Sequence, residues 1–302
     1  AGSSITLTTT DMDISIQDNI EATIETEGQT TIPAHTLYEI VRKLPDNCTI
    51  TLLRANETDT NLTLTVGASE FLLPCLPVDE FPNFEVSDTT HNFSVNSEIL
   101  KTLFTKTRHA ISQEETRYYL NGTYLHPATN TDGTPVLRAV ATDGHRLAKA
   151  QTMQPEGAQD MPGIIIPKKT VSELVKLLES FVGDVNIALS QNKITFTIGT
   201  TTLSSKLIDG KFPDYERVIP KGNDKFLEIS RDNLSRSIDL VIPVSNDRTR
   251  AVKFNIESSK VTLSASSEMN GNAKGSQEVE AKFDSDETIS IGFNSRYVLD
   301  SL

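Results

Sequence analysis

The amino-acid sequence predicts an α+β protein made of three tandem copies of one domain, and two observations lead to that prediction. Short strand patterns surround segments in which apolar residues recur at helical spacing. The same order of landmarks then returns after 131–134 residues. A complete copy is expected to hold two helices and about eight short strands, with the apolar face of each helix packed on antiparallel sheets.

The first copy begins with two strands within residues 4–24, joined at a polar turn near Asp11. A further short strand is expected at Gln29–Pro33. A helix then starts at His35, and its apolar face is predicted to consist of Leu37, Ile40, Val41 and Leu44. Strands are expected at residues 49–53, 62–66 and 70–73, because polar turns separate these apolar runs.

The second copy shows the whole order of elements. A helix is expected from Ser97 to Arg108, and strands at Tyr118–Leu120 and Val136–Ala141. Asp143-Gly144 is a hairpin dipeptide that joins the second of these strands to another apolar strand. A second helix is expected at residues 169–180. The predicted apolar faces of the two helices are Ile99, Leu100, Leu103 and Phe104, and Val171, Leu174, Val175 and Leu178.

The repeat spacing defines the predicted domains. Thr142-Asp143 follows Thr10-Asp11 by 132 residues, and Ile166-Pro167 follows Ile32-Pro33 by 134. Phe212-Pro213-Asp214-Tyr215 follows Phe81-Pro82-Asn83-Phe84 by 131, and Leu234 follows Leu100 by 134. We therefore predict domains at residues 1–90, 91–223 and 224–302. In this register the first and third copies are incomplete, so we expect about forty residues to be missing at each end.

Composition is that of an ordinary soluble globular protein, with 37% hydrophobic and 23% charged residues in 302. No apolar run approaches the about 20 residues that a membrane span needs, and no signal sequence opens the chain, so a cytoplasmic protein is expected. Cys48 and Cys75 lie in no CxxC motif, and the five histidines are scattered. We therefore expect no disulfide framework, no metal and no cofactor.

The net charge of −13 argues against a nucleic-acid binder, but the cations are not evenly spread. They recur on the polar faces of four predicted helices, at Arg42 and Lys43, at Lys101, Lys106 and Arg108, at Lys168, Lys169 and Lys176, and at Arg231 and Arg236. On any one helix the alternative is a merely solvated face. The same sign on four equivalent helices of an acidic chain favours sequence-independent contact with phosphates.

Three motifs carry a family resemblance. Residues 141–148 (Ala-Thr-Asp-Gly-His-Arg-Leu-Ala), 206–215 and 117–122 resemble, in order, signatures of the bacterial DNA polymerase III beta subunit, the sliding-clamp family. The resemblance implies DNA-clamp domains and a non-enzymatic processivity factor that encircles duplex DNA as a head-to-tail homodimeric ring. The implied partners are the polymerase III catalytic subunit, the clamp loader, and other polymerases and repair proteins that carry a clamp-binding peptide.

The resemblance also implies two sets of site residues. A peptide cleft between the second and third domains would use Leu120, Thr142, Gly144, His145, Arg146, Leu147, Pro213, Arg217 and Val218. Some of these residues could instead simply pack in the seam between two domains. DNA contacts would add Tyr118, Tyr119 and His35 to the helix cations. His35 stands where the family usually has a more basic residue, and Glu114 where it has an amide, which weakens the match at both points.

Two alternatives compete with this interpretation. Asp143, His145 and a serine could form a hydrolytic triad, but the sequence has no G-x-S-x-G motif to support one. The stronger alternative is an extracellular acidic β-rich repeat or adhesion protein. The six N-x-S/T sequons and the threonine content fit that class as well. The helix cations and the three motifs favour the clamp over that class.

Overall fold

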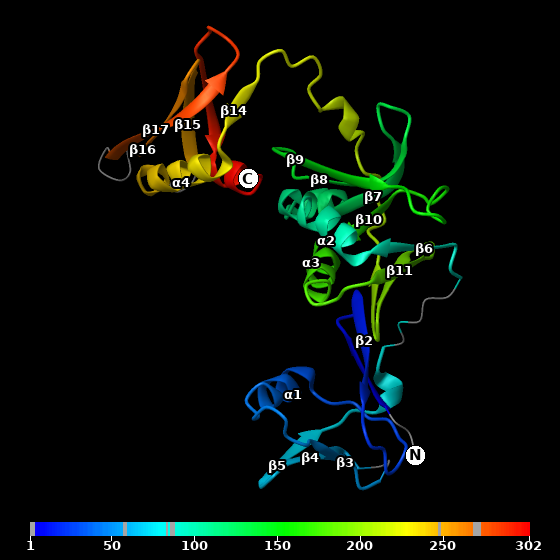
Figure 1. Cartoon of the computed structure of the whole chain (residues 1–302). Helices are drawn as coiled ribbons and strands as arrows, with labels where there is room; N and C mark the ends of the chain where they lie inside the picture. The colour runs from blue at the N-terminus through cyan, green and yellow to red at the C-terminus, as the bar shows by residue number, and fades with distance from the viewer. Residues whose placement is uncertain (1–3, 57–58, 83, 85–87, 247–248, 268–272) are drawn as a thin grey trace. The chain divides into compact units, whose positions relative to one another are not determined.

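The computed structural model describes residues 4–56, 59–82, 84, 88–246, 249–267 and 273–302. Asn83, which belongs to one of the sequence landmarks, lies outside these residues. The chain divides into two compact units, which are described separately. Unit 1 comprises residues 1–143 and 149–210, and unit 2 comprises residues 144–148 and 211–302 (Figure 1).

Unit 1 combines helices with antiparallel strands, as the sequence predicts. Its helices are α1 (Ala34–Val41), α2 (Ser97–Thr105) and α3 (Lys168–Leu177). Its strands are β1 (Ser4–Thr10), β2 (Ile14–Glu21), β3 (Thr51–Leu53), β4 (Asn61–Val66), β5 (Ser69–Pro74), β6 (His91–Asn96), β7 (Gly122–Thr129), β8 (Pro135–Thr142), β9 (Leu147–Met153, whose first two residues are counted in unit 2), β10 (Ile164–Pro167), β11 (Asp184–Leu189), β12 (Lys193–Ile198) and β13 (Thr201–Lys206). Residues 91–206 therefore hold eight strands and two helices, the content expected for a complete copy.

A six-stranded sheet joins the first two repeats, in the order β1-β2-β13-β12-β11-β6. β2 pairs antiparallel with β13, so that Ile16 lies opposite Leu203 although they are far apart in sequence. Alternate residues of β12, Ile194, Phe196 and Ile198, are buried, as expected for strands with one face on the core. Strands of both repeats thus share one hydrogen-bonded layer.

Helices α2 and α3 contact each other and cover the sheets of the second repeat. Asn96 caps α2, because its side chain accepts a hydrogen bond from the backbone N–H of Glu98 at 3.1 Å. The buried residues of the two helices include Leu100, Leu103 and Phe104 of α2 and Val171, Leu174 and Val175 of α3. A second sheet, in the order β10-β7-β8-β9, includes β8, a strand buried along nearly all of its length.

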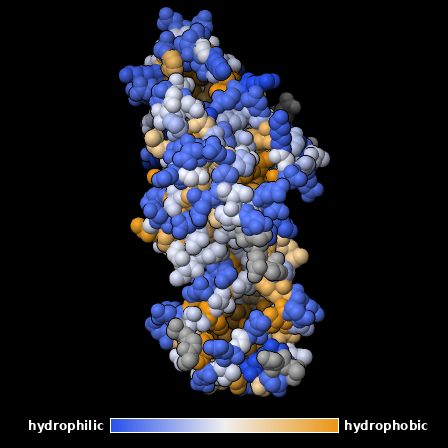
Figure 2. All heavy atoms as spheres, turned by 90° about the vertical axis from the view of Figure 1, so that its right-hand side faces the viewer, coloured by the Kyte–Doolittle hydropathy of each residue, from blue (hydrophilic) through white to orange (hydrophobic). Residues whose placement is uncertain are grey.

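The N-terminal part of unit 1 has a smaller core. Its sheet runs β3-β4-β5, and Leu64, Val66 and Leu73 form the buried cluster against which Leu37, Ile40 and Leu44 pack from α1 and the residues after it. Other apolar side chains of this part are exposed, among them Leu53 (61%) and Leu72 (67%). Figure 2 shows hydrophobic atoms gathered around a hollow at its lower end, where Figure 1 places this sheet.

The structure corrects several expected elements. Gln29–Pro33 is not a strand: the Thr31 hydroxyl bonds both the N–H and the carbonyl of Leu76, in place of a backbone ladder. Residues 118–120 lie in a 3₁₀ turn (Glu115–Leu120), in which Asn121 N–H bonds the Tyr118 carbonyl. The helix expected to end at Arg108 ends at Thr105. Val41 and Ile99 were expected in apolar faces but are 40% and 43% exposed, respectively, because each lies beside the buried stripe of its helix.

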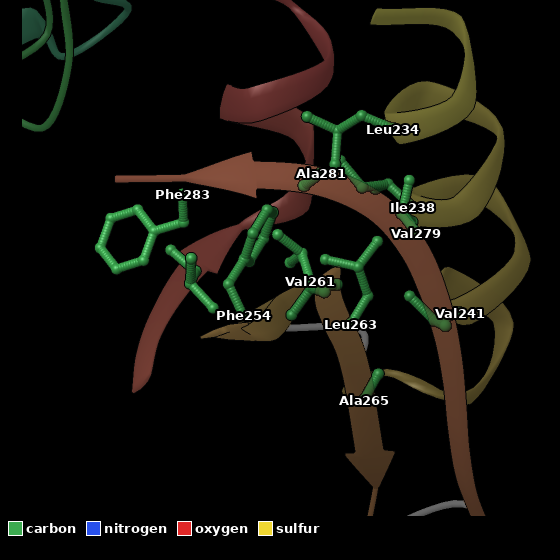
Figure 3. Close-up of a cluster of buried hydrophobic side chains, with 12 residues drawn as sticks. Leu234, Ile238, Val241, Phe254, Val261, Leu263, Ala265, Val279, Ala281 and Phe283 are labelled. Atoms are coloured by element: carbon green, nitrogen blue, oxygen red, sulfur yellow. The ribbon is translucent and has the colours of Figure 1, made fainter. Parts of the chain in front are cut away.

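Unit 2 is a five-stranded antiparallel sheet covered by helix α4. Its strands are β14 (Leu227–Ile229), β15 (Ala251–Glu257), β16 (Lys260–Ser267), β17 (Ala273–Phe283) and β18 (Ile289–Asn294), in the order β14-β17-β16-β15-β18. Its helices are α4 (Arg231–Val241) and α5 (Ser295–Leu299). Figure 3 shows Leu234 and Ile238 of α4 beside Val261 and Leu263 of the sheet, and these four residues are buried.

Candidate functional site

The hairpin between β8 and β9 displays the residues of the first motif. Gly144 has φ of 87°, a conformation that favours glycine, so the chain can turn sharply after Asp143. His145 follows on the exposed side of the turn, and Arg146 and Leu147 are half-buried. The sequence thus places the four residues 144–147 together at one tip, and this tip belongs to unit 2.

Within unit 2, Arg146 contacts helix α5. Its guanidinium donates a hydrogen bond to Asp300 Oδ2 at 2.7 Å and lies 4.4 Å from the centroid of the Tyr297 ring. The His145 ring lies nearly parallel to the same tyrosine ring, 6.4 Å away. A cation held by a carboxylate and an aromatic face has a defined position, and only 18% of the Arg146 side chain is exposed.

The second motif supplies an exposed segment of unit 2. Phe212 and Tyr215 are buried and their rings meet at 6.5 Å, which anchors the short turn at residues 215–217. Pro213 and Arg217 are exposed on it, and Val218 leaves 69% of its surface exposed. Arg217 pairs with Asp214 at 2.7 Å, but 84% of its side chain faces solvent. An apolar and a cationic side chain are therefore both available to a ligand here.

Leu120 and Thr142, the other two residues of the expected cleft, belong to unit 1. Leu120 is buried at 4% exposure, and Thr142 is half-buried at the end of β8. Nearby, Arg117 bonds the Glu114 carboxylate and the Asp143 carbonyl. Glu114 raises the pKa of Arg117 through this hydrogen bond.

The expected DNA-contact cations lie on or directly after the helices, most of them are exposed, and most are paired with an acid nearby. The nitrogen–oxygen distances of these ion pairs are 3.2 Å for Arg42–Glu39, 3.6 Å for Lys43–Glu39, 3.9 Å for Lys101–Glu98, 2.9 Å for Lys176–Glu173 and 2.9 Å for Arg231–Asp232. Pairs of this exposed kind are weak, so a phosphate can replace the carboxylate, although the positive field is reduced. Lys106, Arg108 and Arg236 are also exposed, and Arg108 lies just beyond α2 in a 3₁₀ turn.

The remaining DNA-contact candidates differ in exposure. His35 is exposed on α1, and Tyr118 is 54% exposed with its ring edge-on to half-buried Tyr119 at 5.8 Å. Lys168 and Lys169 begin α3. Lys168 is half-buried, whereas Lys169 is exposed and forms an ion pair with Asp11 in the β1–β2 turn. That hydrogen bond lowers the pKa of Asp11 to about 2 and raises the pKa of Lys169.

Metal binding, disulfide bonding and membrane spanning find little support among the described residues. No group of three or more histidine, cysteine or acidic side chains there is arranged to hold a metal ion, and both cysteines are free thiols. None of the helices described is long and apolar enough to span a bilayer. A cavity of about 800 Å³ opens between α2 and β9, with Lys106 and Lys149 in its lining, and it includes none of the nine expected cleft residues.

Comparisons with known proteins decide the family. The models of the N-terminal, central and C-terminal domains of the DNA polymerase III beta subunit match residues 1–85, 94–214 and 216–302. The chain belongs to this family. The beta sliding clamp of Caulobacter vibrioides is 44% identical over 299 residues, covering 99% of this chain and 79% of that protein. The clamp of Pseudomonas aeruginosa is 35% identical over 302 residues, covering 100% and 79%.

Solved structures agree with the assignment. The sliding clamp from Bartonella birtlesii bound to griselimycin matches with a TM-score of 0.92 and 44% identity, over 99% of this chain and 79% of that one. A Caulobacter crescentus beta sliding clamp matches with a TM-score of 0.91 and 44% identity, over 100% and 79%. The predictions of clamp domains in tandem and of a sliding clamp, a non-catalytic subunit, are confirmed. The extracellular repeat-protein alternative is not supported.

Sequence reasoning about the beta-clamp motifs missed the partners of two key cations. Tyr297 and Asp300 contact Arg146, and Asp11 holds Lys169. The spacing Tyr-x-x-Asp places both side chains on one face of a helix, which is a signal that the sequence does contain. Nothing local to Arg146 or Lys169 indicates these contacts, because the partners are 154 and 158 residues away in the chain.

Proposed function

We propose that this beta-clamp chain encircles duplex DNA as a head-to-tail ring of two copies and holds it through sequence-independent phosphate contacts. The observation that carries the proposal is the recurrence of cations on, or directly after, helices α1, α2, α3 and α4 of a chain whose net charge is −13. A sliding protein needs such contacts, because phosphates are the same at every position along DNA whereas base edges differ.

The proposed DNA-contact residues are those expected from the family and the helix pattern. Lysine and arginine supply charge, and Tyr118 can stack against a base at a duplex end or in a single strand. The set is His35, Arg42, Lys43, Lys101, Lys106, Arg108, Tyr118, Tyr119, Lys168, Lys169, Lys176, Arg231 and Arg236. The Lys169 ammonium group already forms an ion pair with Asp11. A phosphate contact at Lys169 would therefore have to compete with that carboxylate.

A second proposed site binds short peptides of partner proteins, namely the polymerase III catalytic subunit, the clamp loader, and other polymerases and repair proteins. Unit 2 offers Gly144, His145, Arg146, Leu147, Pro213, Arg217 and Val218, and Leu120 and Thr142 are the proposed contributors of unit 1. Leu147 and Val218 provide apolar contact, and the two arginines can orient peptide carbonyls. A peptide with a glutamine and one or two large apolar residues suits this chemistry.

We further propose that the three domains meet near residues 90 and 223, and that the protein works in the cytoplasm. The family-model matches at residues 1–85, 94–214 and 216–302 support boundaries close to these.

The test of the ring is topological. The labelled protein is loaded by a clamp loader onto a nicked circular plasmid, and the bound fraction is measured by gel filtration before and after one restriction cut. A sliding ring stays on the circle and leaves through the ends of the linear molecule. Equal loss from both forms, or retention on the linear form, would contradict the proposal. Sedimentation velocity at two concentrations measures the dimer separately.

A further inference from the structure

Helix α5 presents two side chains away from the core of unit 2. Val298 and Leu299 pack against the hydrophobic cluster that α4 and the sheet share. Asn294 caps the helix by accepting the backbone N–H of Arg296 at 3.0 Å, which fixes where it starts. Tyr297 and Asp300 are three residues apart and therefore lie on one side of the helix end.

Arg146 is held between these two side chains. Asp300 Oδ2 accepts its hydrogen bond at 2.7 Å, and the Tyr297 ring centroid lies 4.4 Å from its guanidinium carbon. The exposed fractions of the two charged side chains are 18% for Arg146 and 31% for Asp300. Because solvent reaches this pair only partly, its charges are screened less than those of Arg217 and Asp214, which are 84% and 57% exposed.

Asp300 changes what Arg146 can do for a ligand. A free guanidinium attracts a carboxylate, whereas one already paired with Asp300 offers an acidic ligand almost no net charge. An acidic peptide residue placed at Arg146 would also bring a second carboxylate close to Asp300, and like charges at contact distance repel. A neutral residue can accept a hydrogen bond from the guanidinium without that repulsion.

We propose that Asp300 sets the charge preference of the peptide site. It holds Arg146 against Tyr297 and neutralises it, so that the site selects peptides that are uncharged at the position facing Arg146. This inference rests on the proposed peptide-binding function and adds a residue that determines specificity. Asp300 acts through Arg146 and is therefore a positioning residue.

The experiment compares one neutral and two acidic peptides on the whole chain. The neutral probe is fluorescein-labelled Gln-Ala-Gln-Leu-Phe, and each acidic probe replaces one of its two glutamines by glutamate. Kd is measured by fluorescence anisotropy for the wild type and for Asp300→Asn. We expect the wild type to prefer the neutral peptide, and Asp300→Asn to tighten binding of at least one acidic peptide by roughly three- to tenfold, an ordinary effect for one partly desolvated charge. Binding of the neutral peptide should change by less than about twofold.

Two further variants make the result specific. Asp286→Asn removes the same charge from an exposed position of unit 2 and should leave the peptide preference unchanged. In the Arg146→Gln background, Asp300→Asn should no longer tighten acidic binding, because the cation that it released is gone. The inference would be overturned if Asp300→Asn still tightened the binding of acidic peptides without Arg146, or if Asp286→Asn tightened it equally. Asp300 would then act by net charge alone.

The possible failures are distinguishable. If all three peptides bind and their ratio is the same in the wild type and Asp300→Asn, the peptide site stands and the role of Asp300 is refuted. If none binds to the wild type, Asp300→Asn or Arg146→Gln while circular dichroism shows folded protein, the peptide site itself is refuted and the role of Asp300 with it.

Discussion

The Lys169 ammonium at the start of α3 donates a hydrogen bond to the Asp11 carboxylate in the β1–β2 turn. Close by, Lys206 of β13 pairs with Asp13 of the same turn at 3.2 Å. Two acids from the first repeat therefore meet two lysines from the second, next to the strand pairing of β2 with β13. The turn is held in place, and one candidate phosphate contact is partly neutralised.

Removing the Asp11 carboxylate should make a pH-dependent difference to stability. The folded pKa is about 2, below the ordinary value of 3.8, so the pair stabilises the protein above that ordinary value and the contribution is lost as pH falls towards 2. Asp11→Asn should lower the free energy of unfolding at pH 7 by less than about 1 kcal/mol, because exposed pairs are screened. Urea unfolding at pH 7 and at pH 3 measures this, and a difference that grows at pH 3 would contradict it.

Reversing the charge of four lysines on, or directly after, α2 and α3 should weaken DNA retention. Replacing Lys101, Lys106, Lys168 and Lys169 by glutamate removes phosphate contacts and adds repulsion, so the bound fraction on nicked circular DNA should fall and the salt dependence should become shallower. The matched control changes four exposed lysines that lie off the helices, Lys221, Lys253, Lys274 and Lys282, by the same total charge. Equal losses in both variants would point to net charge instead of a contact surface.

Leu147→Asp should abolish peptide binding. We expect the wild type to bind a short apolar peptide with Kd in the tens of micromolar or weaker, roughly −6 kcal/mol. The half-buried Leu147 side chain would become a carboxylate that a bound peptide must desolvate, at a cost greater than that gain. Calorimetric titration decides it: a peptide that binds both proteins equally well does not use this site.

The core of unit 2 should be sensitive to truncation of a single side chain. Leu263 is fully buried in the cluster of Figure 3, so Leu263→Ala should cost about 2–5 kcal/mol through lost burial and a cavity. Leu72→Ala in the N-terminal part is the control, because 67% of that side chain is exposed and little packing is lost. Thermal unfolding followed by circular dichroism compares them, and similar shifts would contradict the assigned core.

The sequence by itself determined the elements whose signals are local. Helix α4 (Arg231–Val241) lies where the spacing of Leu234 from Leu100 places a helix in the repeat, and Ser230 caps it while its buried residues recur at helical spacing. The Asp143-Gly144 turn followed from a dipeptide that adopts it readily. The family motifs, which are also contiguous, indicated both the clamp and the residues of its proposed sites.

Only the tertiary structure decided the features that depend on distant partners. Gln29–Pro33 has the composition of a strand, but Thr31 bonds Leu76 instead, and residues 118–120 form a 3₁₀ turn in which Leu120 is buried. The partners of Arg146 and Lys169 follow from chain segments brought together by folding, 154 and 158 residues apart. The spacing Tyr-x-x-Asp shows only that Tyr297 and Asp300 share a helix face; which distant cation they contact is set by distance in space and not by spacing along the chain.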